Sequence, residues 1–301
     1  MNHRQPRIPR SFTYAITFVA MAALSACNDE EKASKQPESS SVAVHVESNE
    51  ENYDDLNSTL IAKFPSPGQG DESSSLDILR PETPFRLYNN LRTWDEDGRD
   101  IASLLETSLG EGSDDVLVFK LGREYGNTSD AFKKRDLEQK IIAETQREAG
   151  KVEGVRSVKF LSEPGKIVSL EIGHYNFDEM SFKIDHCLFS DKLEYSKEEM
   201  RLAQNLKGSD QKRCYFRTTN TELRIGFSGG SGVRFKVENP ELARKIEAQR
   251  SQLKIAVYGY VESVQREKVG GNLVKERLVL IAPQRVLLMD ASGQVLSEAM
   301  L

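Results

Sequence analysis

The strongest hydrophobic pattern in the chain is a pair of long β-type segments near the C-terminus. Residues 253–264 and 273–282 are rich in β-branched and aromatic side chains and flank Gly270-Gly271, a turn-forming pair. Residues 286–289 and 294–296 form a second, shorter pair. The pattern predicts two consecutive antiparallel hairpins, with the two long strands at the centre of a sheet.

Shorter β-type runs precede these hairpins from residue 152 onward. Residues 155–161 and 167–172 lie on either side of Glu163-Pro164-Gly165, which favours a hairpin. A further hairpin is expected between residues 223–227 and 233–237, around a glycine-rich turn. The other elements predicted in this half are strands at 180–188 and 214–217, and helices that begin at Ser196 and at Asn239-Pro240.

Upstream of residue 150 the apolar residues recur every three or four positions, which is typical of helices. We predict helices at 54–64 and 101–109. A longer helix is expected from a cap at Ser129 or Asp130 to about residue 149. Its apolar positions are Phe132, Leu137, Ile141 and Ile142. The run 116–119 is predicted to be a buried strand, and Pro81 and Pro84 favour an irregular segment.

Together the two halves predict an α+β fold. Its helical N-terminal portion is expected to pack on a largely antiparallel sheet or partial barrel. The folded region is predicted to be a single domain over residues 53–301, helix-rich to about residue 150 and strand-rich over 152–301.

One motif is reminiscent of a hydrolase. Gly226-Phe227-Ser228-Gly229-Gly230 fits the G-x-S-x-G pattern, but a nucleophile elbow needs a helix after the serine and a histidine downstream. Here the next run is β-type, and no histidine follows His186. The pattern therefore predicts a turn and no catalytic serine.

The candidate metal sites are also weak. If residues 172 and 180 paired in a hairpin, His174 and His186 would lie near one another and could hold a metal, although their spacing matches no zinc pattern. The alternative is two half-exposed polar residues on strands. Residues 94–98 resemble part of a calcium loop but lack its first and bidentate ligands, so a turn leading into a helix is expected. We assign no catalytic residue and no cofactor.

The N-terminus carries the most specific motif. Arg4, Arg7 and Arg10 precede a mostly apolar run at 11–24, which is too short to span a bilayer. The run ends in Leu24-Ser25-Ala26-Cys27. All four residues resemble the lipobox of bacterial lipoprotein signal peptides. The resemblance implies cleavage after Ala26, leaving residues 1–26 as the signal peptide, and a lipid anchor on Cys27. Because Asn28 rather than aspartate follows Cys27, it favours the outer membrane over the inner one.

Residues 27–52 are acidic and rich in serine, which predicts a flexible tether. The chain has a formal net charge of −6, and the predicted signal peptide removes three arginines and no acid. A mature chain nearer −9 is a poor candidate for binding nucleic acid.

Two cysteines remain once Cys27 is assigned to the lipid. Cys187 and Cys214 flank the helix predicted at Ser196, and a disulfide would join the two ends of that segment. An oxidising compartment favours this pairing over two separate buried thiols.

These features predict a membrane-anchored interaction or envelope-structural module in the periplasm. Its partner would be another envelope protein, peptidoglycan or a small ligand. The alternative is an envelope enzyme, possibly metal-assisted, that uses His174 and His186.

Overall fold

The computed structural model describes residues 56, 58–68, 72–106, 115–166, 168–189, 215–217 and 222–301. The predicted signal peptide, lipidation site and tether at residues 1–52 lie outside the described residues, as do Cys214 and the helix expected at Ser196.

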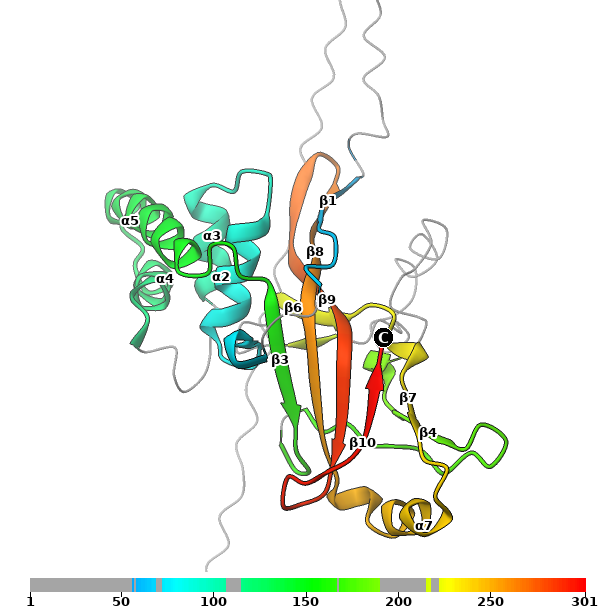
Figure 1. The fold of residues 1–301 in the computed structure, drawn as a ribbon. Coiled ribbons are helices and arrows are strands. Elements are labelled where there is room, and N and C mark those ends of the chain that lie inside the picture. Colours follow the sequence, from blue (N-terminus) through cyan, green and yellow to red (C-terminus); the bar gives the residue numbers. More distant parts are fainter. Residues whose placement is uncertain are drawn as a thin grey trace, which may run out of the picture. The chain divides into compact units, whose positions relative to one another are not determined.

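The long C-terminal hairpin is the centre of the main sheet (Figure 1). Strand β8 (Lys254–Val269) pairs antiparallel with β9 (Asn272–Met289). Gly270 and Gly271 have φ values of 58° and 80°, as a two-residue type I′ turn requires. Both predicted C-terminal hairpins are therefore confirmed, because β10 (Val295–Met300) also pairs antiparallel with the end of β9.

Each central strand has further neighbours. Strand β8 pairs with β1 (Thr59–Lys63) and β3 (Ser157–Ser162), and β9 pairs with β6 (Leu223–Phe227). Two short strands, β2 (Leu76–Asp77) and β5 (Phe216–Arg217), extend the sheet beyond β3 and β6. The sheet is mixed, because the pairs β2–β3 and β6–β9 are parallel. It curls into a half-barrel, and the predicted α+β fold is confirmed.

The helical layer comprises α2 (Glu82–Leu91), α3 (Gly98–Glu106), α4 (Leu117–Asn127) and α5 (Ala131–Gly150). These helices pack on one another, and α2 and α3 also contact the central strands (Figure 1). The side chain of Asp130 caps α5 by accepting hydrogen bonds from the backbone N–H groups of Phe132 and Lys133. Among the described helices, none is long and apolar enough to cross a bilayer.

A small second sheet consists of β4 (Ser181–Lys183) and β7 (Arg234–Lys236). Helix α7 (Pro240–Ala248) follows β7, and Asn239 caps it as predicted. Short 3₁₀ turns complete the described elements: η1 (Glu72–Ser74), η3 (Cys187–Phe189), η5 (Gly230–Gly232) and η6 (Arg250–Gln252).

Four local predictions in the N-terminal half are wrong. Part of the helix expected at 54–64 is strand β1, which is held by the edge of β8. The segment with Pro81 and Pro84 is helix α2, because proline is tolerated in a first turn, where N–H groups have no intrahelical partner. The apolar run 116–119 enters helix α4 instead of forming a strand. Phe132, expected on the buried face of α5, is 85% exposed.

Two predicted hairpins are also wrong. Three of their four arms form strands, whereas residues 168–172 contribute only the isolated bridge between Ile172 and Ile184. Strand β3 pairs with β2 and β8, and no strand pairing joins it to residues 167–172 among the described residues. Strands β6 and β7 lie in different sheets, because β6 pairs with β9 and β7 pairs with β4. In both cases a partner distant in sequence replaces the neighbouring segment.

A buried ion-pair network joins the helical layer to the central hairpin. Arg266 of β8 and Arg277 of β9 lie directly opposite each other and are fully buried. The carboxylate of Glu96, just before α3, receives Arg266 Nη1 at 2.8 Å and Arg277 Nη2 at 2.7 Å. Tyr88 of α2 donates to the same carboxylate at 2.6 Å. One carboxylate thus connects a helix, a loop and both long strands.

Candidate functional site

A row of large side chains crosses the open face of the main sheet. Lys159 of β3 pairs with Tyr258 of β8, Tyr258 pairs with Arg285 of β9, and Arg285 pairs with Met300 of β10. Directly paired residues project from the same face of a sheet. The positions next to this row, Val158, Val257 and Val286, are fully buried on the opposite face. The row therefore faces away from the core.

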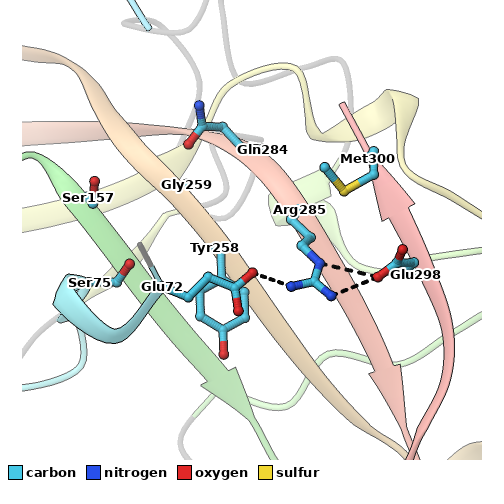
Figure 2. Close-up of a pocket in the computed structure, with 9 residues that line it drawn as sticks. All are labelled: Glu72, Ser75, Ser157, Tyr258, Gly259, Gln284, Arg285, Glu298 and Met300. Carbon is cyan, nitrogen blue, oxygen red and sulfur yellow. Dashed lines mark hydrogen bonds and ion pairs between the residues drawn. The ribbon is translucent and has the colours of Figure 1, made fainter. Parts of the chain in front are cut away.

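A hollow of about 360 Å³ lies on this face, between the sheet and the 3₁₀ turn η1 (Figure 2). The row supplies Tyr258, Arg285 and Met300 to its walls. The remaining lining residues are Glu72, Ser75, Ser157, Gly259, Gln284 and Glu298. These residues come from β3, β8, β9, β10, η1 and the position directly after η1, so only the folded chain brings them together.

Arg285 forms the electrostatic centre of the hollow. Its Nε and Nη2 donate to Glu298 Oε2 at 3.2 and 2.8 Å, and its Nη1 donates to Glu72 Oε1 (Figure 2). The hydrogen bonds with Glu298 and then with Glu72 raise the pKa of Arg285 above its ordinary value. Two carboxylates and one guanidinium give this triad a net charge of −1.

A bulge in β9 positions Arg285. Tyr258 pairs with Arg285, but the next residue, Gly259, pairs with Pro283, so Gln284 is an extra residue in β9. Bulges of this kind redirect side chains. The amide nitrogen of Gln284 donates to Ser66 Oγ at 3.1 Å and to the carbonyl oxygen of Gly68 at 3.0 Å. The segment preceding η1 is thereby held on the same face as Arg285.

The structure does not unite the two histidines considered as metal ligands. The ladder pairs Ile172 with Ile184, which places His174 across from β4 and His186 beyond the end of that strand. The His174 side chain is 80% exposed and contacts Glu247 Oε1 through Nδ1 at 2.7 Å. Nδ1 of His186 accepts the backbone N–H of Leu188 at 3.2 Å.

Neither the pKa of His186 nor the neighbouring acidic side chains indicate a metal site. Burial lowers the pKa of His186 below its ordinary value. Within the described residues, no group of three or more His, Cys, Asp or Glu side chains is arranged to hold a metal ion. The calcium-like run at 94–98 is a turn leading into α3, as predicted, and its Glu96 binds arginines.

The G-x-S-x-G motif forms a turn between two sheets. Ser228 follows β6, and η5 and then β7 come after it, so the helix of a nucleophile elbow is not present there. Gly229 has a φ of 69°, a left-handed conformation that favours glycine. The Ser228 hydroxyl donates to Glu262 Oε2 at 2.5 Å. The motif forms a turn, but the hairpin expected around it is wrong, because β6 and β7 lie in different sheets.

The remaining predicted sites are not tested by the fold. Cys187 lies in η3, whereas its expected disulfide partner Cys214 lies outside the described residues. Cys27 also lies outside them. The disulfide and the lipid anchor therefore stay predictions.

The residues of the hollow carry one sequence signal. Tyr258 alternates with buried aliphatic residues along β8, and Arg285 interrupts an apolar run in β9. Alternation of this kind marks the outer face of a strand. The alternation along β8 and β9 gives no indication of Glu72, which belongs to a segment far away in sequence.

Comparison of the chain with protein-family models, curated proteins and solved structures finds no match.

Proposed function

We propose that this chain is a lipid-anchored module of a bacterial cell envelope that binds a partner through the open face of its curled sheet. The supporting observation is the row formed by Lys159, Tyr258, Arg285 and Met300 beside the hollow. Tyrosine, arginine and methionine are enriched at protein interfaces relative to the rest of the surface. The partner would be another envelope protein, peptidoglycan or a small ligand in the periplasm.

The location of the module rests on the lipobox at residues 24–27. Two or more acyl chains form a lasting anchor, whereas one chain binds a membrane only reversibly. The acidic segment 27–52 would act as a tether between the membrane, preferably the outer membrane, and the folded region. We do not advance the alternative of an enzyme based on His174 and His186, because their contacts with Glu247 and Leu188 lie in different parts of the fold.

The anchor has a direct test. Cys27→Ser is expected to abolish incorporation of labelled palmitate, because the thiol that receives the lipid is lost. The variant should also no longer be anchored in the membrane fraction through a lipid. Ser25→Ala is the matched control, since the lipobox pattern accepts either residue at that position. Palmitate labelling of the Cys27→Ser chain would contradict the proposal.

The binding face is tested by crosslinking in intact cells. A photoreactive phenylalanine analogue at Lys159, which is exposed on the row, is expected to give a specific adduct. The same analogue at Gln139, which is exposed on α5, should not give that adduct. Tyr258→Ala is expected to reduce the Lys159 adduct several-fold, because a central aromatic contributes much of the binding energy at an interface. Identical adducts from both positions would argue against a specific face.

A further inference from the structure

We infer that the hollow between β8, β9, β10 and η1 binds an alkylammonium group, the positively charged end of a lysine side chain or of a small aliphatic amine. The inference rests on the proposed binding function and names the ligand chemistry of the same face. It follows from the charge, the open hydrogen-bonding positions and the shape of the lining residues.

The charge of the residues that line the hollow disfavours an anionic ligand. Arg285 is the only cationic side chain among the described residues that line it, and both Glu298 and Glu72 already bind its guanidinium. An incoming carboxylate or phosphate would have to displace these acids and would meet their negative charge. The net charge of −1 instead favours a cation.

The carboxylate oxygens that Arg285 does not bind also favour a cationic ligand. Arg285 occupies Oε2 of Glu298 and Oε1 of Glu72, so the other oxygen of each carboxylate has no hydrogen-bond partner within the described part of the chain. An ammonium group has three N–H donors and no acceptor. Its hydrogen bonds to carboxylates would be charge-assisted, and therefore stronger than neutral ones.

Ser75 adds a polar group to the wall of the hollow. This residue lines the hollow and is only 9% exposed, yet its hydroxyl has no hydrogen-bond partner among the described residues. An ammonium bound beside Glu72, three residues earlier on η1, would supply a donor to this hydroxyl.

The walls of the hollow suit the aliphatic part of such a ligand. Figure 2 shows the Tyr258 ring and the Met300 side chain on either side of Arg285. An aromatic face attracts a cation, and a thioether packs against methylene groups. The two side chains would therefore contact the stem of the ligand while the carboxylates bind its charged end.

The experiment uses the full-length chain with ¹³C-labelled methionine methyl groups, of which the sequence has six. The Met300 signal is assigned with Met300→Leu. Titration with Nα-acetyl-L-lysine methylamide is expected to shift the Met300 signal saturably. The norleucine analogue has the same stem without the charge and should not shift it. Cadaverine, a free aliphatic diamine, forms the second arm, and tighter binding of either probe identifies a peptide-borne or a free amine as the ligand.

Glu298→Gln is expected to weaken binding of the better probe about tenfold, because a charged acceptor becomes neutral. Glu276→Gln is the matched control: Glu276 also pairs with an arginine, and the side chains of Glu298 and Glu276 are 49% and 50% exposed. Absence of a saturable Met300 shift with both amines would overturn the inference. An equal shift with the norleucine analogue would also overturn it. If the Lys159 crosslink persists in either case, the binding face stands and only the ligand class is wrong.

Discussion

Glu96→Gln is expected to lower the free energy of unfolding by about 3–5 kcal/mol, the range for removing one partner of a buried ion pair. The wild-type carboxylate pairs with both Arg266 and Arg277, whose side chains are fully buried and face each other across the central hairpin. Asp100 supplies a second carboxylate, 3.3 Å from Arg266. The amide carries no charge and has only one acceptor oxygen. The two guanidinium groups would then repel each other in a site from which water is excluded. Urea unfolding at pH 7 measures the loss.

Acid provides a second measurement of the same interaction. Burial alone would raise the pKa of Glu96, but Arg277 and then Arg266 and Tyr88 outweigh it and lower the pKa from 4.5 to about 2. The folded state therefore releases this proton more readily than the unfolded state. The resulting stabilisation is complete above pH 4.5 and is lost as the pH falls towards 2. The stability difference between wild type and Glu96→Gln should narrow over that range.

Asp95→Asn is the matched control, because Asp95 precedes Glu96 but is exposed. A surface change of this kind is expected to alter the free energy of unfolding by less than about 0.5 kcal/mol. Equal urea midpoints for Glu96→Gln and the wild type at pH 7 would show that the network contributes nothing to stability. A stability difference that stays constant into acid would show that the Glu96 carboxylate is not its source.

The parts of the fold that could be predicted from the sequence are those specified by neighbouring residues. The β8–β9 hairpin depends on a two-residue glycine turn, and Asp130 and Asn239 cap their helices with their own side chains. Each of these signals acts within a few residues of chain. Their outcome does not depend on which distant segment packs nearby.

The wrong predictions concern segments whose structure or strand pairing depends on contacts with a segment distant in sequence. Four apolar residues at 116–119 fit a strand or a buried helix equally well, and packing of α4 on α3 and α5 selects the helix. Likewise, β6 pairs in parallel with β9 rather than with its neighbour β7. Parallel pairing between segments this far apart leaves no signature in either segment alone.

The candidate site was hidden for the same reason. Glu72, Tyr258 and Arg285 belong to three separated segments that only the folded sheet and η1 bring together. Glu96 lies within the calcium-like run, which predicts a turn leading into a helix and gives no indication of arginine partners. Its true partners, Arg266 and Arg277, are far downstream, so no local pattern could connect them.

Gly259→Ala is expected to lower the free energy of unfolding by about 1–3 kcal/mol, the usual range for overpacking a core. A Cβ atom at this position would lie 2.3 Å from the carbonyl oxygen of Ala282 and 3.1 Å from the Cα atom of Pro283. Both obstacles are backbone atoms of the paired strand β9, so no change of side-chain rotamer removes the clash. Relief requires β8 and β9 to separate, and the effect should fall at the upper end of the range. Urea unfolding measures it.

The same change also tests how the bulge serves the hollow, because Gly259 pairs beside the extra residue Gln284 and next to Arg285. Separation of the strands should therefore perturb the Met300 methyl signal as well as stability. Gly150→Ala is the matched control: a Cβ atom there has no neighbour within 4 Å, and alanine favours a helix by about 1 kcal/mol over glycine. The control should leave stability unchanged or raise it. An unchanged urea midpoint for Gly259→Ala would mean that β9 can shift away from position 259 at no cost, and that the bulge does not fix Arg285.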